Sequence, residues 1–313
     1  MDRRDRLEFL ETTLKNYREL DIGNDIVFEE AVYLAKRCDN PFCINRFGLA
    51  IPEPDIESRA NFLALRITQL DELMALESKD DFALDLGATI LLVIREMYSL
   101  DSVLSFRTAV WSKYLSNETR YSFVVQRVRM AGFFTDEEMW NAAMRESKHI
   151  IESSYRKESL ELEEYLELMQ GNKLTSPFGA DSLRLFQIAS EYWMLSLGKP
   201  TPFTRGDLYN LLISEVSELL EAASNIKKGS PDNREARMKE YSFELADVFN
   251  YLMQMLTVMG YDLSATIRKA SGKRYRETLG IGRELALGRK ILWNRRFKWW
   301  REKRYEILLK SLK

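Results

Sequence analysis

The sequence is short of the residues on which several common active sites depend. Its 313 residues contain one histidine, His149, and two cysteines, Cys38 and Cys43. A single histidine excludes His-rich zinc sites, and we do not expect this one to serve a catalytic triad. Two cysteines in a chain of this length do not make a disulfide framework. His149 stands in a charged stretch, where we expect it to be solvated.

Long apolar runs are also absent. None reaches the roughly 18 residues that a bilayer-spanning helix needs. The N-terminal stretch MDRRDRLEFLETTL alternates charged and apolar residues and lacks the continuous apolar core of a signal peptide. Apolar residues make up 45% of the chain and charged residues 30%, which is normal for a soluble globular protein. We therefore expect a cytoplasmic protein without membrane association.

Glycine and proline are scarce, with 14 and 7 copies. Apolar residues recur at spacings of three and four through most of the chain, which is the helical period, whereas strand-like alternation is nearly absent. The pattern predicts an all-α fold. Helices are expected to begin near Arg6, Asp25 and Thr135, and to cover 58–77, 81–98, 101–116, 181–197, 206–228, 234–259, 262–278 and 282–311.

Four regions follow from these helices. We expect an N-terminal helical domain over 1–134, a long connecting helix over 135–179, a second helical domain over 180–280, and a basic aromatic helix over 281–313. A turn containing glycine and proline precedes a hairpin of two helices in each domain, which suggests a tandem repeat. The first copy carries Gln69 at the place of Glu215 and retains only Asp85 on its second helix, so it lacks the chemistry of the second. Chance similarity between two helical hairpins is the alternative.

The second hairpin carries two pairs of acids. Glu215 and Glu218 stand three residues apart on the first helix, and Glu244 and Asp247 stand three apart on the second. Residues at this spacing lie one turn apart on the same face of a helix. If the two helices pack antiparallel, the four carboxylates meet in a small volume.

Carboxylates at such short distances repel one another unless they are protonated or neutralised by a cation. Oxygen ligands without histidine or cysteine suit Mg²⁺, with Mn²⁺ as the alternative. Acidic pairs also occur on solvated helix faces, as at Glu161 and Glu164. The four acids differ from those because apolar residues flank them, for example Val216 beside Glu215 and Val248 beside Asp247.

The pattern Glu-x-x-Glu, 25 intervening residues and Glu-x-x-Asp resembles the all-α NTP pyrophosphohydrolase superfamily, which includes MazG, dimeric dUTPases and phosphoribosyl-ATP pyrophosphohydrolases. LLISEVSELLEA resembles the first metal-binding helix of that family and FELADVFNYLMQM the second. The downstream run Lys273-Arg274-Tyr275-Arg276-Glu277 resembles the basic run of MazG. The resemblance covers 185–280 well and 45–98 faintly.

This resemblance implies Mg²⁺-dependent cleavage of a (d)NTP to (d)NMP and pyrophosphate by a metal-activated water. Glu215, Glu218, Glu244 and Asp247 would be the catalytic, metal-binding acids. Cations on the downstream helix would neutralise phosphate charge. Asn250 would contact sugar or base, or be a plain surface amide; Trp193 and Tyr209 would stack on the base, or be core residues. The substrate-binding candidates are Lys269, Lys273, Arg276, Asn250, Trp193 and Tyr209.

The C-terminal part of the chain differs in charge from the rest. Residues 268–313 hold 16 Lys and Arg against 4 Glu, a net charge of +12, so the remainder carries −14 of the total of −2. Five aromatic residues are interleaved with the cations of 281–313. The segment is expected either to dock on the acidic body or to bind nucleic acid, where cations neutralise phosphates and aromatics stack. A homo-oligomer is a further possibility, since bundles of this type usually complete their sites by pairing two helical units.

Two other functions compete with the hydrolase. One is a catalytically weak, regulatory nucleotide-binding protein on the same bundle. The other is a helical nucleic-acid-binding protein whose acidic pairs are incidental. The presence of all four acids in the second hairpin favours the enzyme.

Overall fold

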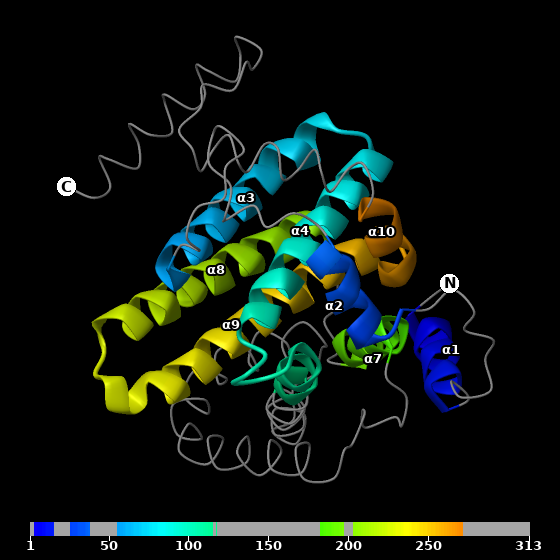
Figure 1. Cartoon of the computed structure of the whole chain (residues 1–313). Coiled ribbons are helices and arrows are strands. Elements are labelled where there is room, and N and C mark those ends of the chain that lie inside the picture. The colour runs from blue at the N-terminus through cyan, green and yellow to red at the C-terminus, as the bar shows by residue number, and fades with distance from the viewer. Residues whose placement is uncertain are drawn as a thin grey trace, which may run out of the picture.

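The computed structural model describes residues 3–15, 26–37, 55–114, 117, 182–196 and 203–271. Over these ranges the secondary structure is helical and contains no strand, which confirms the all-α prediction. None of the helices described combines the length and apolarity needed to cross a bilayer. The helices are α1 Arg3–Lys15, α2 Phe28–Arg37, α3 Ile56–Leu76, α4 Lys79–Ser99, α7 Leu183–Ser196, α8 Arg205–Lys228, the 3₁₀ turn η3 Pro231–Asn233, α9 Arg234–Val258 and α10 Leu263–Ala270 (Figure 1). A further helical segment covers 106–114.

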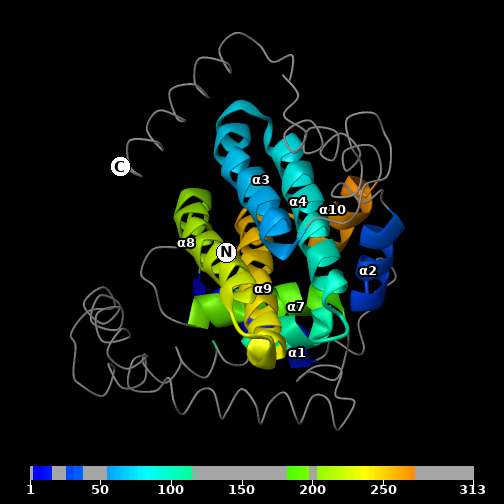
Figure 2. The same ribbon diagram turned by 60° about the vertical axis from the view of Figure 1, so that its left-hand side comes forward.

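Four long helices form the centre of the molecule. The α3–α4 hairpin and the α8–α9 hairpin lie against each other, so that α3 packs on α8 and α4 packs on α9 (Figures 1 and 2). The two hairpins expected from the sequence are therefore both present among the described residues. They form two halves of one bundle.

The second hairpin is fixed at both ends of α8 by local interactions. Thr204 and Asp207 form a capping box, in which each side chain accepts a hydrogen bond from the other residue's backbone N–H. Gly229 caps the other end, and Pro231 begins the 3₁₀ turn that leads into α9. The observed helices differ by one residue at most from the predicted 206–228 and 234–259. These caps set the register of the two acid pairs.

One hydrophobic core serves both predicted domains. It contains buried residues from α2, α3, α4, α7, α8, α9 and α10. An aromatic cluster extends it over the segment 106–114: Phe106 meets Phe249 of α9 edge-on at 5.1 Å, and Trp111 meets Phe186 of α7 at 4.9 Å. Buried aromatic pairs in this geometry add to the energy of area burial. They hold the segment 106–114 against α9 and α7.

Charged residues inside the first hairpin are neutralised by arginines. Arg59 pairs with Glu96 at 2.8 Å and Arg66 with Asp85 at 2.6 Å, and all four side chains are buried. Tyr241 of α9 donates a hydrogen bond to Glu96 at 3.3 Å, which links the two hairpins. Asp85, the acid that the first copy retains, is therefore held in an ion pair within the core.

Several predictions from the sequence lie beyond the described residues. They include the connecting helix 135–179 and the C-terminal helix 281–313. The described parts of 1–134 and 180–280 share the core outlined above, and the boundary between them stays a prediction.

Gly87 is where α4 meets α10 most closely. A Cβ atom there would lie 2.9 Å from Thr266 Cγ2 and 3.3 Å from the Thr266 carbonyl oxygen, so α10 would have to move. We expect Gly87→Ala to lower the free energy of unfolding by about 1–3 kcal/mol, as measured by urea denaturation.

Gly206 in the first turn of α8 provides the control. A Cβ atom at this position has one neighbour within 4 Å, Thr204 Oγ1 at 3.8 Å. Gly206→Ala should be neutral or stabilising by up to about 1 kcal/mol, because alanine loses less backbone entropy than glycine. Equal stability of the two variants would contradict the close packing of α4 on α10.

Candidate metal centre

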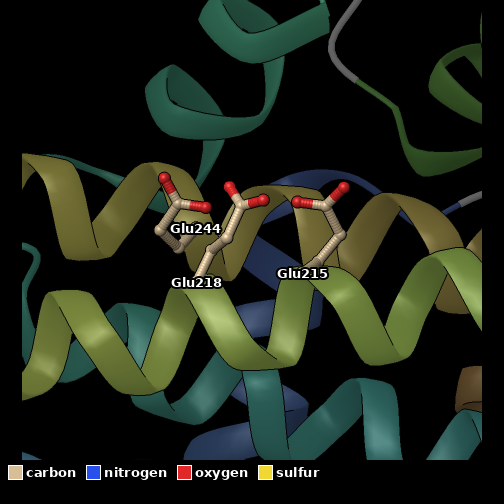
Figure 3. A group of neighbouring side chains, drawn as sticks. All are labelled: Glu215, Glu218 and Glu244. Carbon is tan, nitrogen blue, oxygen red and sulfur yellow. The ribbon is translucent and has the colours of Figure 1, made fainter.

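The acid pairs of α8 and α9 come together on one side of their hairpin. Glu215, Glu218 and Glu244 each present a carboxylate oxygen, and these atoms lie within 4.8 Å of one another. Figure 3 shows the three carboxylates leaving the antiparallel helices α8 and α9 on the same side, toward the segment 106–114. The spacing of three residues within each pair places successive acids one turn apart on this side.

The fourth acid of the pattern is engaged by a lysine. Asp247 is 6% exposed, and its Oδ2 atom lies 2.7 Å from Nζ of Lys113. Lys113 belongs to the segment 106–114, so the N-terminal half of the chain supplies this cation. The sequence patterns give no indication of it, because a single lysine on an amphipathic helix is an ordinary surface residue.

Burial and mutual repulsion shift the pKa values of two of the acids. Burial is the largest cause of the rise in the pKa of Glu215 to about 8, with further contributions from the charges of Asp247 and Glu218. Burial likewise raises the pKa of Glu244 to about 7, although the positive charge of Lys113 opposes the rise. Near neutral pH these two acids therefore hold protons for much of the time unless another cation neutralises them.

The carboxylates fit a divalent cation that prefers oxygen. Glu244 Oε2 is buried, and it has no hydrogen-bond partner among the described residues. A buried carboxylate oxygen without a donor is costly unless it is protonated or bound to a cation. Among the described residues the cluster consists of three converging carboxylates without a histidine or cysteine, which matches the preference of Mg²⁺ and Mn²⁺.

The other predicted substrate contacts on α7, α8 and α9 are placed as follows. Asn250 is half-buried one turn beyond Asp247, and its Oδ1 atom has no hydrogen-bond partner within the described ranges. Tyr209 is buried, and its hydroxyl donates to the carbonyl of Thr68 at 3.3 Å. Trp193 is buried edge-on against Tyr114, with 6.5 Å between ring centroids. Both side chains are part of the hydrophobic core, and their contact with a base stays a prediction.

The predicted phosphate-binding cations are only partly described. Lys269 is exposed at the end of α10, a helix that packs on α4 and α7. Lys273 and Arg276 lie outside the described residues. The approach of this basic run to the acids stays a prediction, whereas Lys113 contacts one of them, Asp247, directly.

Fold and site together define an all-α protein with a partly buried carboxylate cluster suited to a divalent cation. No family model, curated protein or solved structure matches the chain.

The raised pKa values make stability depend on pH. A carboxyl group whose pKa is higher in the folded state than its ordinary value of 4.5 binds more protons when folded. Its contribution to stability is complete below that ordinary value and is lost as the pH rises toward about 7 for Glu244 and about 8 for Glu215. Without divalent ions, the protein should therefore lose stability between pH 5 and pH 8.

Glu215→Gln should remove part of this loss. At pH 8 in EDTA we expect the variant to be more stable than the wild type by on the order of 2 kcal/mol, and to be closer to it at pH 5. Urea denaturation at both pH values measures the difference. Glu235→Gln, at an exposed acid of α9 paired with Lys239, serves as the control. If the difference in the free energy of unfolding between Glu215→Gln and the wild type does not change with pH, ionisation of Glu215 does not destabilise the cluster.

Proposed function

We propose that the protein is a Mg²⁺-dependent nucleoside triphosphate pyrophosphohydrolase. The observation that carries this proposal is the meeting of Glu215, Glu218 and Glu244, with carboxylate oxygens from two helices within 4.8 Å. These are three of the four acids of the Glu-x-x-Glu and Glu-x-x-Asp pattern, and the fourth, Asp247, stands one turn from Glu244 on the same helix.

Glu215, Glu218, Glu244 and Asp247 would hold the cation. When bound, Mg²⁺ or Mn²⁺ supplies charge neutralisation for the triphosphate and lowers the pKa of a coordinated water. In the reaction, a water oxygen adds to the α-phosphorus. The bond between the α-phosphorus and the oxygen that bridges it to the β-phosphorus breaks, and this oxygen leaves with the pyrophosphate. The products are a nucleoside monophosphate and pyrophosphate.

The protein's own side chains contribute proton transfer and shielding. One of the four acids would accept the proton that the attacking water loses, as a positioned carboxylate general base does. The segment 106–114 lies over the carboxylates (Figure 3). It limits access of bulk water from that side, which strengthens electrostatic interactions within the site.

Pyrophosphate release from a panel of canonical and modified NTPs and dNTPs tests the proposal. The wild type should release pyrophosphate with Mg²⁺ and lose this activity in EDTA. Glu218→Gln should reduce kcat/KM by about 100-fold or more, because it removes one carboxylate charge from the centre while keeping the side-chain shape. Glu218 is exposed, so the substitution should leave the fold intact.

Glu235→Gln removes a carboxylate from the beginning of α9 and should retain wild-type activity. Nucleotide binding without turnover in the wild type would favour the regulatory alternative. Equal activity of Glu218→Gln and the wild type would contradict the assignment of the metal centre.

A further inference from the structure

The N-terminal half of the chain reaches the acids through Lys113. Its segment, 106–114, is anchored by two buried aromatic rings that precede Lys113 in the sequence, with Phe106 against Phe249 and Trp111 against Phe186. Both rings belong to the shared core. The position of Lys113 over α9 is thus set by the packing of the two halves on each other.

Lys113 lies where a ligand of the acids would come. The carboxylates of Glu215, Glu218 and Glu244 point from the hairpin toward the segment 106–114 (Figure 3). Lys113 Nζ is 2.7 Å from Asp247 Oδ2, and the lysine side chain is 20% exposed against 8% for that of Asp247. A ligand bound at the acids can therefore reach the ammonium group from solvent.

The carboxylates would repel an anion unless cations neutralise them. Among the described residues, one ammonium group, that of Lys113, contacts the acids through Asp247, and its single positive charge does not balance four carboxylates. Once divalent cations neutralise the acids, Asp247 no longer depends on Lys113 alone for its neutralisation. An ammonium group is a compact charge that commonly binds phosphate oxygens.

We propose that Lys113 is a substrate-binding residue, which donates a hydrogen bond to a phosphate oxygen of a polyphosphate held at the acids of α8 and α9. This inference rests on the proposed function for the location of the polyphosphate. It gives the N-terminal half a direct part in the site.

Binding of Mn²⁺ and of inorganic tripolyphosphate to the full chain tests the assignment. Mn²⁺ binding is measured by electron paramagnetic resonance, and binding of the Mn²⁺–tripolyphosphate complex by calorimetry. Lys113→Met should bind Mn²⁺ at least as tightly as the wild type, because a repelling positive charge is gone. Its Kd for the tripolyphosphate complex should rise by about 10- to 100-fold, whereas Lys113→Arg should stay within about 3-fold of the wild type because it keeps the charge.

Arg107→Met is the matched control, since Arg107 lies on the same segment and pairs with Glu29 of α2 at 3.7 Å. It should bind both probes as the wild type does. Unchanged tripolyphosphate binding by Lys113→Met would overturn the proposal, as would loss of Mn²⁺ and tripolyphosphate together, which indicates a structural role. If Lys113→Met does not fold, Lys113→Gln takes its place and is read in the same way.

The same experiment separates this inference from the hydrolase proposal. A wild type that binds tripolyphosphate through Lys113 but releases no pyrophosphate from any nucleotide would contradict the hydrolase proposal and support the role of Lys113. Pyrophosphate release with the same KM in the wild type and Lys113→Met would leave the hydrolase proposal standing and overturn the role of Lys113. A wild type that does not bind Mn²⁺–tripolyphosphate would also overturn it.

Discussion

Repulsion between carboxylates on adjacent helices is the constraint on which the rest of the structure depends. The α8–α9 hairpin brings Glu215, Glu218 and Glu244 within 4.8 Å of one another beside apolar surface. Packing of the two helices against each other and against α3 and α4 has to offset this repulsion. Burial is the largest cause of the rise in the pKa of Glu215 to about 8 and of Glu244 to about 7, and the charges of the neighbouring carboxylates add to it. A bound cation would reduce the repulsion, which is the physical basis of the proposed metal site.

Buried charges are neutralised differently in the two hairpins of the bundle. In the first hairpin Arg66 neutralises Asp85 within the core. In the second hairpin the acids outnumber Lys113, the cation that pairs with Asp247 among the described residues and that comes from outside the hairpin. Charge in the first hairpin is thus paired within the hairpin, whereas charge in the second is only partly neutralised by the described residues. Both arrangements exist within one shared core.

Much of the fold and part of the site could be predicted from the sequence because they depend on local periodicity. The helices expected over 206–228 and 234–259 appear as α8 and α9, and the acids therefore share a side of the hairpin. Tyr209 and Trp193 show the limit of such reasoning. Helical spacing shows which residues lie on the same stripe of a helix, but only the neighbouring helices decide whether that stripe faces a ligand or the core, where both side chains are buried.

The sequence by itself determined the all-α class of the described residues, the bounds of the main helices and the spacing of the acids, because each depends on residues that are close together along the chain. Only the tertiary structure decided that the α3–α4 and α8–α9 hairpins form one bundle and that Lys113 pairs with Asp247. The physical reason is that these contacts join segments far apart in the sequence, and aromatic packing such as that of Phe106 on Phe249 positions the segment that carries Lys113. Local patterns of residues do not predict which distant segments will pack against each other.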